Sequence, residues 1–467
     1  MKKLLHLPST LSPAFSFILS LTLMSCLSAC SMSQAQSSMH PPLMSVDNAP
    51  SDAAASTPPG NTPFDAAAAL MPEKDAAPDQ LTLLMVGDIL LHTPIEDNAL
   101  HPDGTYHFDT IFAHTREAIQ NADLAFVNQE VIIGGEELGI SGYPAFNAPY
   151  AIGDALADAG FDVICHATNH AMDKGKRGIL NCVSYWGENH PEIAVVGIHN
   201  AAASNETAIP GTAASASSTA AFANGITAPN TTAPSDATDS NADHYFVPGT
   251  YICLYTKNDI TVAILNYTYG TNGIPLPAEM PYAVDLLEEE RVIADIRTAE
   301  ELADFTVVCP HWGTEYRLTA DSMQEKWTQL FLENGVDLVL GTHPHVIEPI
   351  TWVENPDTGH KMLVYYSLGN FVNWTSGTGA GVSNRMVGGM AEVTLSRGKD
   401  DTVVISDYGV EAVVCHVEEK TDGITVYPLS EYTAELSGQN AIRSQAPDFS
   451  LDYCIGLCND VWGELWK

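Results

Sequence analysis

Residues 81–92 read LTLLMVGDILLH, an apolar run that ends in Gly87, Asp88 and His92. A continuous apolar run of this length is typical of a strand that is buried on both faces. Comparable runs occur at 124–130, 161–167, 193–197, 260–267, 305–311, 336–343 and 362–371. Helical patterns lie between several of these runs, at 109–121, 149–159, 284–302 and 321–334. Strands that alternate with helices predict an α/β architecture.

Beyond residue 385 the pattern changes to strands without helices between them. Three such segments, at 388–396, 401–418 and 423–429, are predicted to form antiparallel strands. Residues 448–467 predict a short helix, with Trp462 and Trp466 packing back on the domain. We therefore expect one large domain over residues 80–432, followed by a C-terminal tail over residues 433–467.

The N-terminal residues have a different character from that domain. Residues 1–29 have a basic end, an apolar core and small residues before a cleavage point, the pattern of a secretory signal. Leu27-Ser28-Ala29-Cys30 matches the bacterial lipobox, in which the cysteine is lipidated; an ordinary signal with a coincidental cysteine is the alternative. Residues 30–79 are rich in Ala, Ser and Pro, which predicts a disordered tether. We expect an extracytoplasmic protein, lipid-anchored through Cys30 to a bacterial membrane.

Residues 200–243 interrupt the α/β pattern with a second segment of low complexity. The segment contains no Lys or Arg and a single aromatic residue, Phe222. A structureless stretch of this length inside a domain is either a disordered insertion or a functional loop. We expect a solvated, disordered insertion.

The composition limits the classes of partner. The 467 residues include 19 Lys and Arg against 58 Asp and Glu, a formal net charge of −39. Nucleic acid is not an expected partner, because phosphate contacts need clustered Lys and Arg. The chain has no GxxxxGK[ST] loop and no GxSxG elbow, so ATP-driven polymerisation and serine hydrolysis are not expected. Cys165, Cys253 and Cys309 lie within apolar runs and are expected to be small buried hydrophobes.

Polar side chains gather at the ends of six predicted strands. They are Asp88, Asn128, Gln129, Glu130, His166, Asn169, His170, Asp173, His311, Glu315, His343, His345 and Asn370. In open α/β sheets, ligand sites lie beyond the carboxyl ends of the strands. Asp, Glu, Asn and His are suitable ligands for Zn²⁺, Mn²⁺, Fe²⁺ or Mg²⁺. We expect a divalent-metal or polar catalytic site; a hydrogen-bonded cluster that binds a ligand without metal is the alternative.

The motifs around these residues resemble a known family. GDILLH, VNQE, ATNHAMDKG, PHWGTEY, GTHPHVI and YSLGNF, in this order, look like the CapA family of poly-γ-glutamate capsule biosynthesis proteins, also called PgsA-type. The resemblance covers about residues 81–378, apart from the insertion. The family is similar to calcineurin-like metallophosphoesterases, which implies a four-layer α-β-β-α sandwich with two mixed sheets. It also implies a cell-surface protein that serves the synthesis, export or attachment of an anionic capsule polymer, with that polymer or its machinery as partner.

The resemblance also implies roles for individual residues. By similarity, the ligands of one or two divalent ions (Mn, Fe, Zn or Mg) are Asp88, Glu130, Asn169, His311 and His343. The candidate catalytic residues are His170, Glu315 and His345. The sequence departs from the phosphoesterase pattern at Asp88 and His92, which are four residues apart where Asp-x-His is usual. This departure leaves open whether the centre holds one metal or two.

Three functions are open on these observations. The chain is a CapA-type lipoprotein of capsule assembly, an extracytoplasmic metal-dependent phosphoesterase or other hydrolase, or a non-catalytic polymer-binding scaffold. An acidic protein repels an anionic polymer, so bound cations or a locally basic cleft would be needed. Arg317, Lys326 and Lys174 flank the motif strands and are the candidates for such a cleft.

Overall fold

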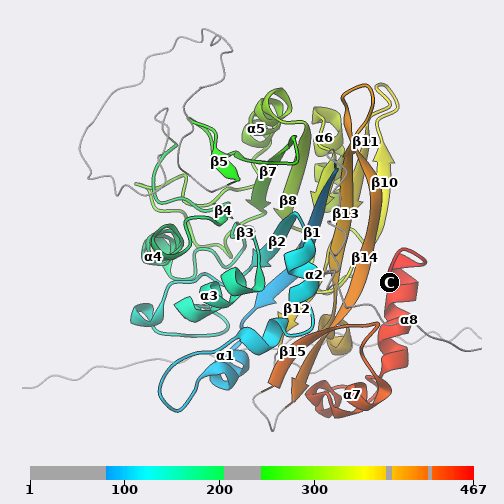
Figure 1. The fold of residues 1–467 in the computed structure, drawn as a ribbon. Helices are drawn as coiled ribbons and strands as arrows, with labels where there is room; N and C mark the ends of the chain where they lie inside the picture. The colour runs from blue at the N-terminus through cyan, green and yellow to red at the C-terminus, as the bar shows by residue number, and fades with distance from the viewer. Residues whose placement is uncertain (1–79, 204–242, 375–380, 419–422) are drawn as a thin grey trace, which may run out of the picture. The chain divides into compact units, whose positions relative to one another are not determined.

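Two mixed β-sheets form the centre of the computed structural model (Figure 1). The structure describes residues 80–203, 243–374, 381–418 and 423–467. All of these residues fall within one of the two units into which the chain divides, residues 72–467. The expected signal and tether, and residues 204–242 of the expected insertion, lie outside the described residues.

The larger sheet has eight strands in the order β15-β14-β13-β1-β2-β3-β4, with β12 also paired to β1. Strands β1 to β4 run parallel, whereas β13, β14 and β15 are antiparallel, as the sequence predicted for the segments beyond residue 385. The strands are β1 (Gln80–Leu90), β2 (Leu124–Gln129), β3 (Val163–Cys165), β4 (Ala194–Val196), β12 (Asn370–Asn373), β13 (Val387–Arg397), β14 (Val403–Glu418) and β15 (Gly423–Pro428).

The smaller sheet has seven strands in the order β10-β11-β9-β8-β7-β6-β5. Its central strands β7, β8, β9 and β11 are parallel, and antiparallel strands flank them at both edges. The strands are β5 (His244–Phe246), β6 (Cys253–Lys257), β7 (Ile260–Thr268), β8 (Phe305–His311), β9 (Leu338–Leu340), β10 (Ile350–Glu354) and β11 (Lys361–Tyr365).

Helices accompany both sheets, and α5 and α6 cover the smaller one, where they contact β7, β8 and β11 (Figure 1). The helix α6 begins at a capping box between Asp321 and Gln324 and ends at Gly335, which is left-handed. Within the described ranges, no helix is both long and apolar enough to span a bilayer. The helices are α1 (Thr93–Ala99), α2 (Arg116–Asn121), α3 (Tyr150–Ala159), α4 (Gly175–Asn189), α5 (Glu289–Leu302), α6 (Ser322–Asn334), α7 (Ala434–Gln439) and α8 (Leu451–Trp462). Short 3₁₀ turns are η1 (Asp109–Phe112), η2 (Glu136–Leu138), η3 (Val382–Met386) and η4 (Ala441–Ser444).

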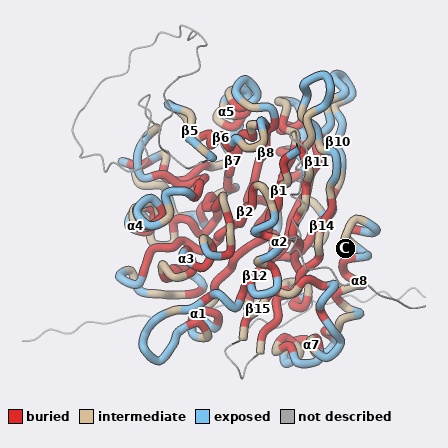
Figure 2. Tube along the Cα trace, in the orientation of Figure 1, coloured by how far each residue is buried: buried red, intermediate tan, exposed pale blue. Residues whose placement is uncertain are grey.

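The main hydrophobic core contains buried side chains from both sheets, and a second core lies between the smaller sheet and α5 and α6. Figure 2 shows the strands largely buried and the connecting loops exposed. Cys165, Cys253 and Cys309 are buried free thiols, as predicted. In the C-terminal segment, Trp462 is buried in the main core, and its Nε1 donates to the Glu348 carbonyl at 2.9 Å. The C-terminal helix is therefore part of the same core as the sheets.

The predicted strand 362–371 is wrong in one respect, because it is two strands in different sheets. β11 belongs to the smaller sheet and β12 pairs with β1 of the larger one. The chain crosses between the sheets just before Asn370, and Gly369 takes a φ of +66° there. Glycine adopts this left-handed conformation at little cost. The predicted helix 109–121 is likewise divided, into η1 and α2.

Candidate metal centre

The candidate centre lies where strand ends from both sheets meet. Asp88 lies near the end of β1, and Glu130 directly follows β2. The other sheet supplies His311 at the end of β8 and, in the loop after β9, His343 and His345. These five residues are buried, none more than 4% exposed. Parallel strands thus bring together residues that are far apart in the sequence.

The ligand atoms form two groups that share Glu130. Glu130, His311 and His343 offer atoms that lie within 4.8 Å of one another, and so do Asp88, Glu130 and His345. The His345 ring has its Nε2 3.6 Å from Oε1 of Glu130 and its Nδ1 3.3 Å from Oδ2 of Asp88. Nε2 of His311 lies 3.7 Å from the same Oε1. If cations are bound by both groups, Glu130 would be the residue that the two groups share.

The surroundings of the Glu130 carboxyl indicate whether these residues could bind a cation. It is fully buried, and neither of its oxygens has a hydrogen-bond partner among the described residues. Burial raises its pKa well above the ordinary value; His345 opposes this effect, and the charge of Asp88 adds to it. An ionised carboxylate is costly to bury without a partner, and a divalent cation would supply one. The donor set therefore fits a divalent cation.

The histidines around Glu130 differ in their preferred protonation. Burial, followed by the charges of neighbouring histidines, lowers the pKa values of His311 and His343 well below the ordinary range. Both imidazoles are therefore neutral at pH 7, the form that binds a metal. Burial also lowers the pKa of His345, but Glu130 and Asp88 outweigh it and raise that pKa to about 9. A cation at Glu130 would compete with this proton on His345.

The turn His343-Pro344-His345 is held in an uncommon backbone conformation. The φ angles of His343 and His345 are +99° and +59°. Such conformations cost on the order of 1–3 kcal/mol per non-glycine residue and persist where the surroundings impose them. The His343 N–H donates to Oδ2 of Asp88 at 3.3 Å, and Oδ1 of Asn370 lies 3.0 Å from Nδ1 of His345. Partners in the larger sheet thus fix a turn of the smaller one.

His170 forms a pair with a buried carboxylate. Its Nδ1 lies 2.7 Å from Oδ2 of Asp173, which also accepts the Phe146 N–H at 2.8 Å. The Phe146 ring packs edge-on against His170, with ring centroids 4.6 Å apart. Nδ2 of Asn272 lies 3.4 Å from Nδ1 and 3.5 Å from Nε2 of the same ring. Asp173 and Phe146 together thus fix the orientation of the His170 ring.

Two further predicted residues lie at different distances from the cluster. Oδ1 of Asn169 lies 3.0 Å from Nε2 of His311, so Asn169 joins the cluster through that ring. Glu315 is exposed, and in the described part of the chain no hydrogen bond links it to the cluster. Its negative charge still contributes to raising the pKa values of Glu130 and His345.

Two amides at the centre were among the polar residues expected at strand ends, but no role was predicted for them. Nδ2 of Asn128 donates to Oδ1 of Asp88 at 2.8 Å and lies 3.4 Å from Nδ1 of His311. Asn370 contacts His345 through its side-chain oxygen, as described above. The sequence does contain a signal for Asn128. It lies two residues before Glu130, and side chains two residues apart on a strand share a face, so Asn128 is expected on the same face as Glu130.

The predicted basic residues lie away from the ligand cluster. Lys326 is exposed and pairs with a glutamate of α5 at 3.1 Å. Lys174 is hydrogen-bonded to the loop 141–145, and Arg317 is exposed. A different cation, Arg385, is connected to the cluster, because Nδ2 of Asn370 donates to the carbonyl oxygens of both Arg385 and His345, each at 3.1 Å. Burial, and then the charges of His345, His170 and Arg385, lower the pKa of His92 to about 4.

The sequence matches one family over most of the described domain. The family described as bacterial capsule synthesis protein PGA_cap matches residues 82–375. The chain belongs to this family. It is 24% identical over 321 residues to the capsule biosynthesis protein CapA of Bacillus anthracis, covering 66% of this chain and 64% of that one. It is 26% identical over 224 residues to the PGA biosynthesis protein CapA of Bacillus subtilis (strain 168), covering 47% of this chain and 45% of that one.

The resemblance to the CapA family is thus confirmed, and the PGA_cap family belongs to the metallophosphatase-like superfamily. The two mixed sheets agree with the expected fold class. Two solved structures are more distantly similar. NAD nucleotidase (NadN) of Haemophilus influenzae has a TM-score of 0.38 at 10% identity, covering 83% of this chain and 63% of that one. The sulfate thiohydrolase SoxB of Thermus thermophilus has a TM-score of 0.29 at 13% identity, covering 72% and 42%.

Proposed function

We propose that this PGA_cap protein acts on an anionic capsule polymer or its precursor, of the poly-γ-glutamate type, through divalent cations bound at Glu130. The observation that carries the proposal is the fully buried carboxyl of Glu130, which has no hydrogen-bond partner among the described residues and is shared by two groups of candidate ligand atoms. The relatives are named for capsule biosynthesis and PGA biosynthesis, which supports the choice of polymer. The protein lies outside the cytoplasm and is attached to the membrane by a lipid on Cys30.

The cluster supplies the ligands for one or two ions of Mn, Fe, Zn or Mg. They are Asp88, Glu130, Asn169, His311, His343 and His345. A bound divalent cation polarises the bond to be cleaved and lowers the pKa of a bound water. Burial keeps His311 and His343 neutral, and Asn128 holds the carboxylate of Asp88 in place through its hydrogen bond.

His170 supplies the proton chemistry beside the ligands. Asp173 holds its Nδ1 at 2.7 Å, which orients the ring. The opposite nitrogen, Nε2, then donates a proton to the leaving oxygen or nitrogen, or stabilises negative charge that develops there. The arrangement therefore favours hydrolysis or transfer over passive binding.

The test is an assay of the purified protein on γ-linked polyglutamate and on a phosphodiester, bis(p-nitrophenyl) phosphate. Activity is measured after chelation and after Mn²⁺, Zn²⁺ or Mg²⁺ is returned. We expect chelation to abolish turnover and metal to restore it. His170→Ala should lose about 10²–10⁴-fold in rate while retaining its metal.

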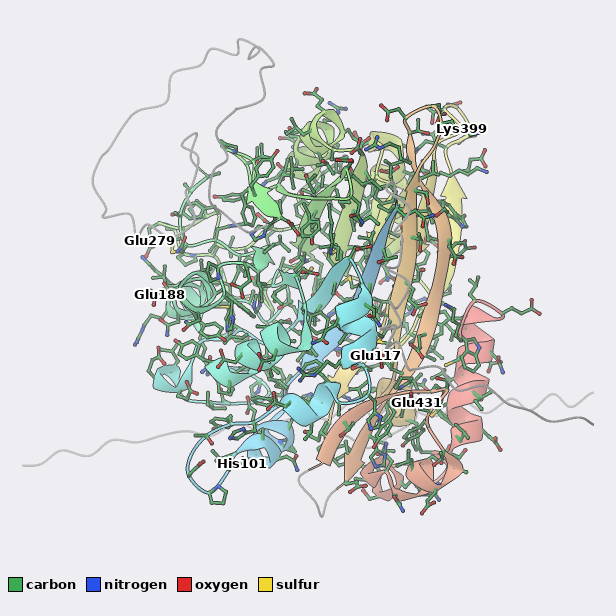
Figure 3. The ribbon with its side chains drawn as sticks, viewed as in Figure 1. His101, Glu117, Glu188, Glu279, Lys399 and Glu431 are labelled. Carbon is green, nitrogen blue, oxygen red and sulfur yellow. The ribbon has the colours of Figure 1, made fainter. Side chains whose placement is uncertain are left out.

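The matched control is His101→Ala, which removes an exposed histidine (Figure 3) and should leave the rate unchanged. If neither chelation nor the His170→Ala substitution changes the turnover rate, the catalytic proposal is refuted. Metal binding without turnover of either substrate would instead favour the polymer-binding scaffold.

A further inference from the structure

Arg385 is a cation of a strongly acidic chain, and it has no carboxylate partner among the described residues. It lies in η3, the turn that leads into β13, and it is half-buried. In the part of the chain that the structure describes, its guanidinium forms no ion pair, and its buried Nε has no hydrogen-bond partner. Arg291 and Arg397, by contrast, each pair with aspartates. A buried donor left unpaired is costly, and an oxyanion ligand would satisfy it.

The guanidinium is held in a fixed orientation on an aromatic ring. Cζ of Arg385 lies 3.8 Å from the centroid of the Tyr316 ring. Tyr316 has a φ of +66°, and its N–H donates to the Pro344 carbonyl at 2.7 Å. The Tyr316 and His345 ring centroids are 6.0 Å apart. The stack therefore stands beside the turn that carries the two histidine ligands.

Asn370 connects the backbone of Arg385 to the same turn. Its Nδ2 donates to the carbonyl oxygens of Arg385 and His345, each at 3.1 Å, while its Oδ1 faces Nδ1 of His345. The charge of Arg385 also contributes to the lowered pKa of His92, after burial and the charges of His345 and His170. Arg385 is thus built into the wall of the centre and is not a mobile surface residue.

We propose that Arg385, stacked on Tyr316, binds an anionic group of the substrate, a carboxylate or a phosphate, next to the metal ligands. The planar guanidinium binds two oxygens of such a group at once, and the Tyr316 ring sets its plane. This inference rests on the proposed function and names its substrate class. It also explains how a protein with a net charge of −39 admits an anionic polymer at its centre.

The test is calorimetric binding of two probes, glutarate and inorganic phosphate, to the metal-loaded protein and to the chelated protein. We expect Arg385→Gln to lower the affinity for the probe about 10–100-fold, while the metal content of the variant stays at the wild-type level. Tyr316→Leu should also weaken binding, and Tyr316→Phe, which keeps the ring, should not. The probe that depends on Arg385 identifies the substrate group as a carboxylate or a phosphate.

Arg317→Gln is the matched control, since it removes the same charge from an exposed position on the neighbouring loop. Equal weakening by Arg317→Gln and Arg385→Gln would show a general effect of charge and would overturn the inference. An affinity in Arg385→Gln within about twofold of wild type, or no binding of either probe, would also overturn it. Metal content, measured on the same samples, separates this failure from a failure of the metal centre itself.

Discussion

Glu130 and Glu348 are both fully buried carboxylic acids, but their surroundings differ. Oε2 of Glu348 accepts a hydrogen bond from Gln324 at 2.6 Å, whereas Glu130 has no such partner among the described residues. Burial raises the pKa of Glu348 from 4.5 to about 7, although Gln324 opposes the effect. Oε1 of Glu348 has no hydrogen-bond partner among the described residues either, so the two carboxyls differ in the bond to Gln324 and in the candidate ligand atoms around Glu130.

Glu348 makes stability depend on pH in a defined direction. Its pKa is higher in the folded state, so the folded state holds the proton as pH rises from about 4.5 to about 7. Stability should fall over that range, because the unfolded chain releases its proton first. Glu348→Gln keeps the acceptor for Gln324 and does not titrate. Its advantage over wild type in free energy of unfolding should grow from pH 5 to pH 8, toward a limit on the order of 3 kcal/mol.

Glu188→Gln is the control for this series, because Glu188 is exposed on α4 (Figure 3). Its difference from wild type should be small at every pH. An advantage of Glu348→Gln that is the same at pH 5 and pH 8 would contradict the account of Glu348.

Some residues of the centre could be predicted from the sequence and others could not. Asp88, His311 and His343 each follow an apolar run, so the α/β pattern alone places them at one edge of the molecule. The position of Arg385 depends on its stack with Tyr316, which has a left-handed backbone. Neither the stack nor that backbone conformation has a signal in composition or periodicity.

At the scale of elements, the centre depends on a close approach of β1 and the segment before β12. The Asp88 N–H donates to the Gly369 carbonyl at 2.9 Å. A Cβ added at Gly87 would overlap that same carbonyl oxygen. Gly87→Ala should therefore push the two backbones apart and displace Asp88 from the ligand cluster.

We expect Gly87→Ala to lower the free energy of unfolding in urea by about 1–3 kcal/mol or more, and to reduce metal content. Gly187→Ala is the matched control, since the Cβ added on α4 would meet no atom within 4 Å beyond its chain neighbours and the backbone of its own helix. It should stabilise the helix by up to about 1 kcal/mol. An equal and small effect of both substitutions would contradict the close approach.

The same crossing explains the wrong prediction at 362–371. The run is continuously apolar into the Ser-Leu-Gly-Asn segment, so periodicity gives no sign of a break. The break depends on the left-handed φ of Gly369 and on the pairing of β12 with β1, a contact between residues far apart in sequence. The order of alternating strands and helices was predictable because buried parallel strands are continuous apolar runs.

At the scale of the whole molecule, the centre requires both sheets. Asp88 and Glu130 come from the larger sheet, and His311, His343 and His345 from the smaller. The acidic surface, seen at Glu117, Glu279 and Glu431 (Figure 3), would repel an anionic membrane. A lipid on Cys30 is then the attachment that the sequence offers.

Cys30→Ser should therefore release the protein from membranes or block its processing. The measurement is fractionation of cells in high salt, followed by detection of the chain. A Ser variant that still sediments with membranes would show that the anchor lies elsewhere, and Cys26→Ser, within the expected signal, serves as the control.

The most direct test of the central claim is the metal content of the chain, purified without chelator and measured by elemental analysis. We predict one to two equivalents of Mn, Fe or Zn in the wild type and in Glu188→Gln. We predict strong loss in Glu130→Gln, Asp88→Ala and His343→Ala. Two results together would contradict the account: the wild-type protein contains none of these metals, and added Mn²⁺, Fe²⁺, Zn²⁺ or Mg²⁺ neither binds to it nor stabilises it.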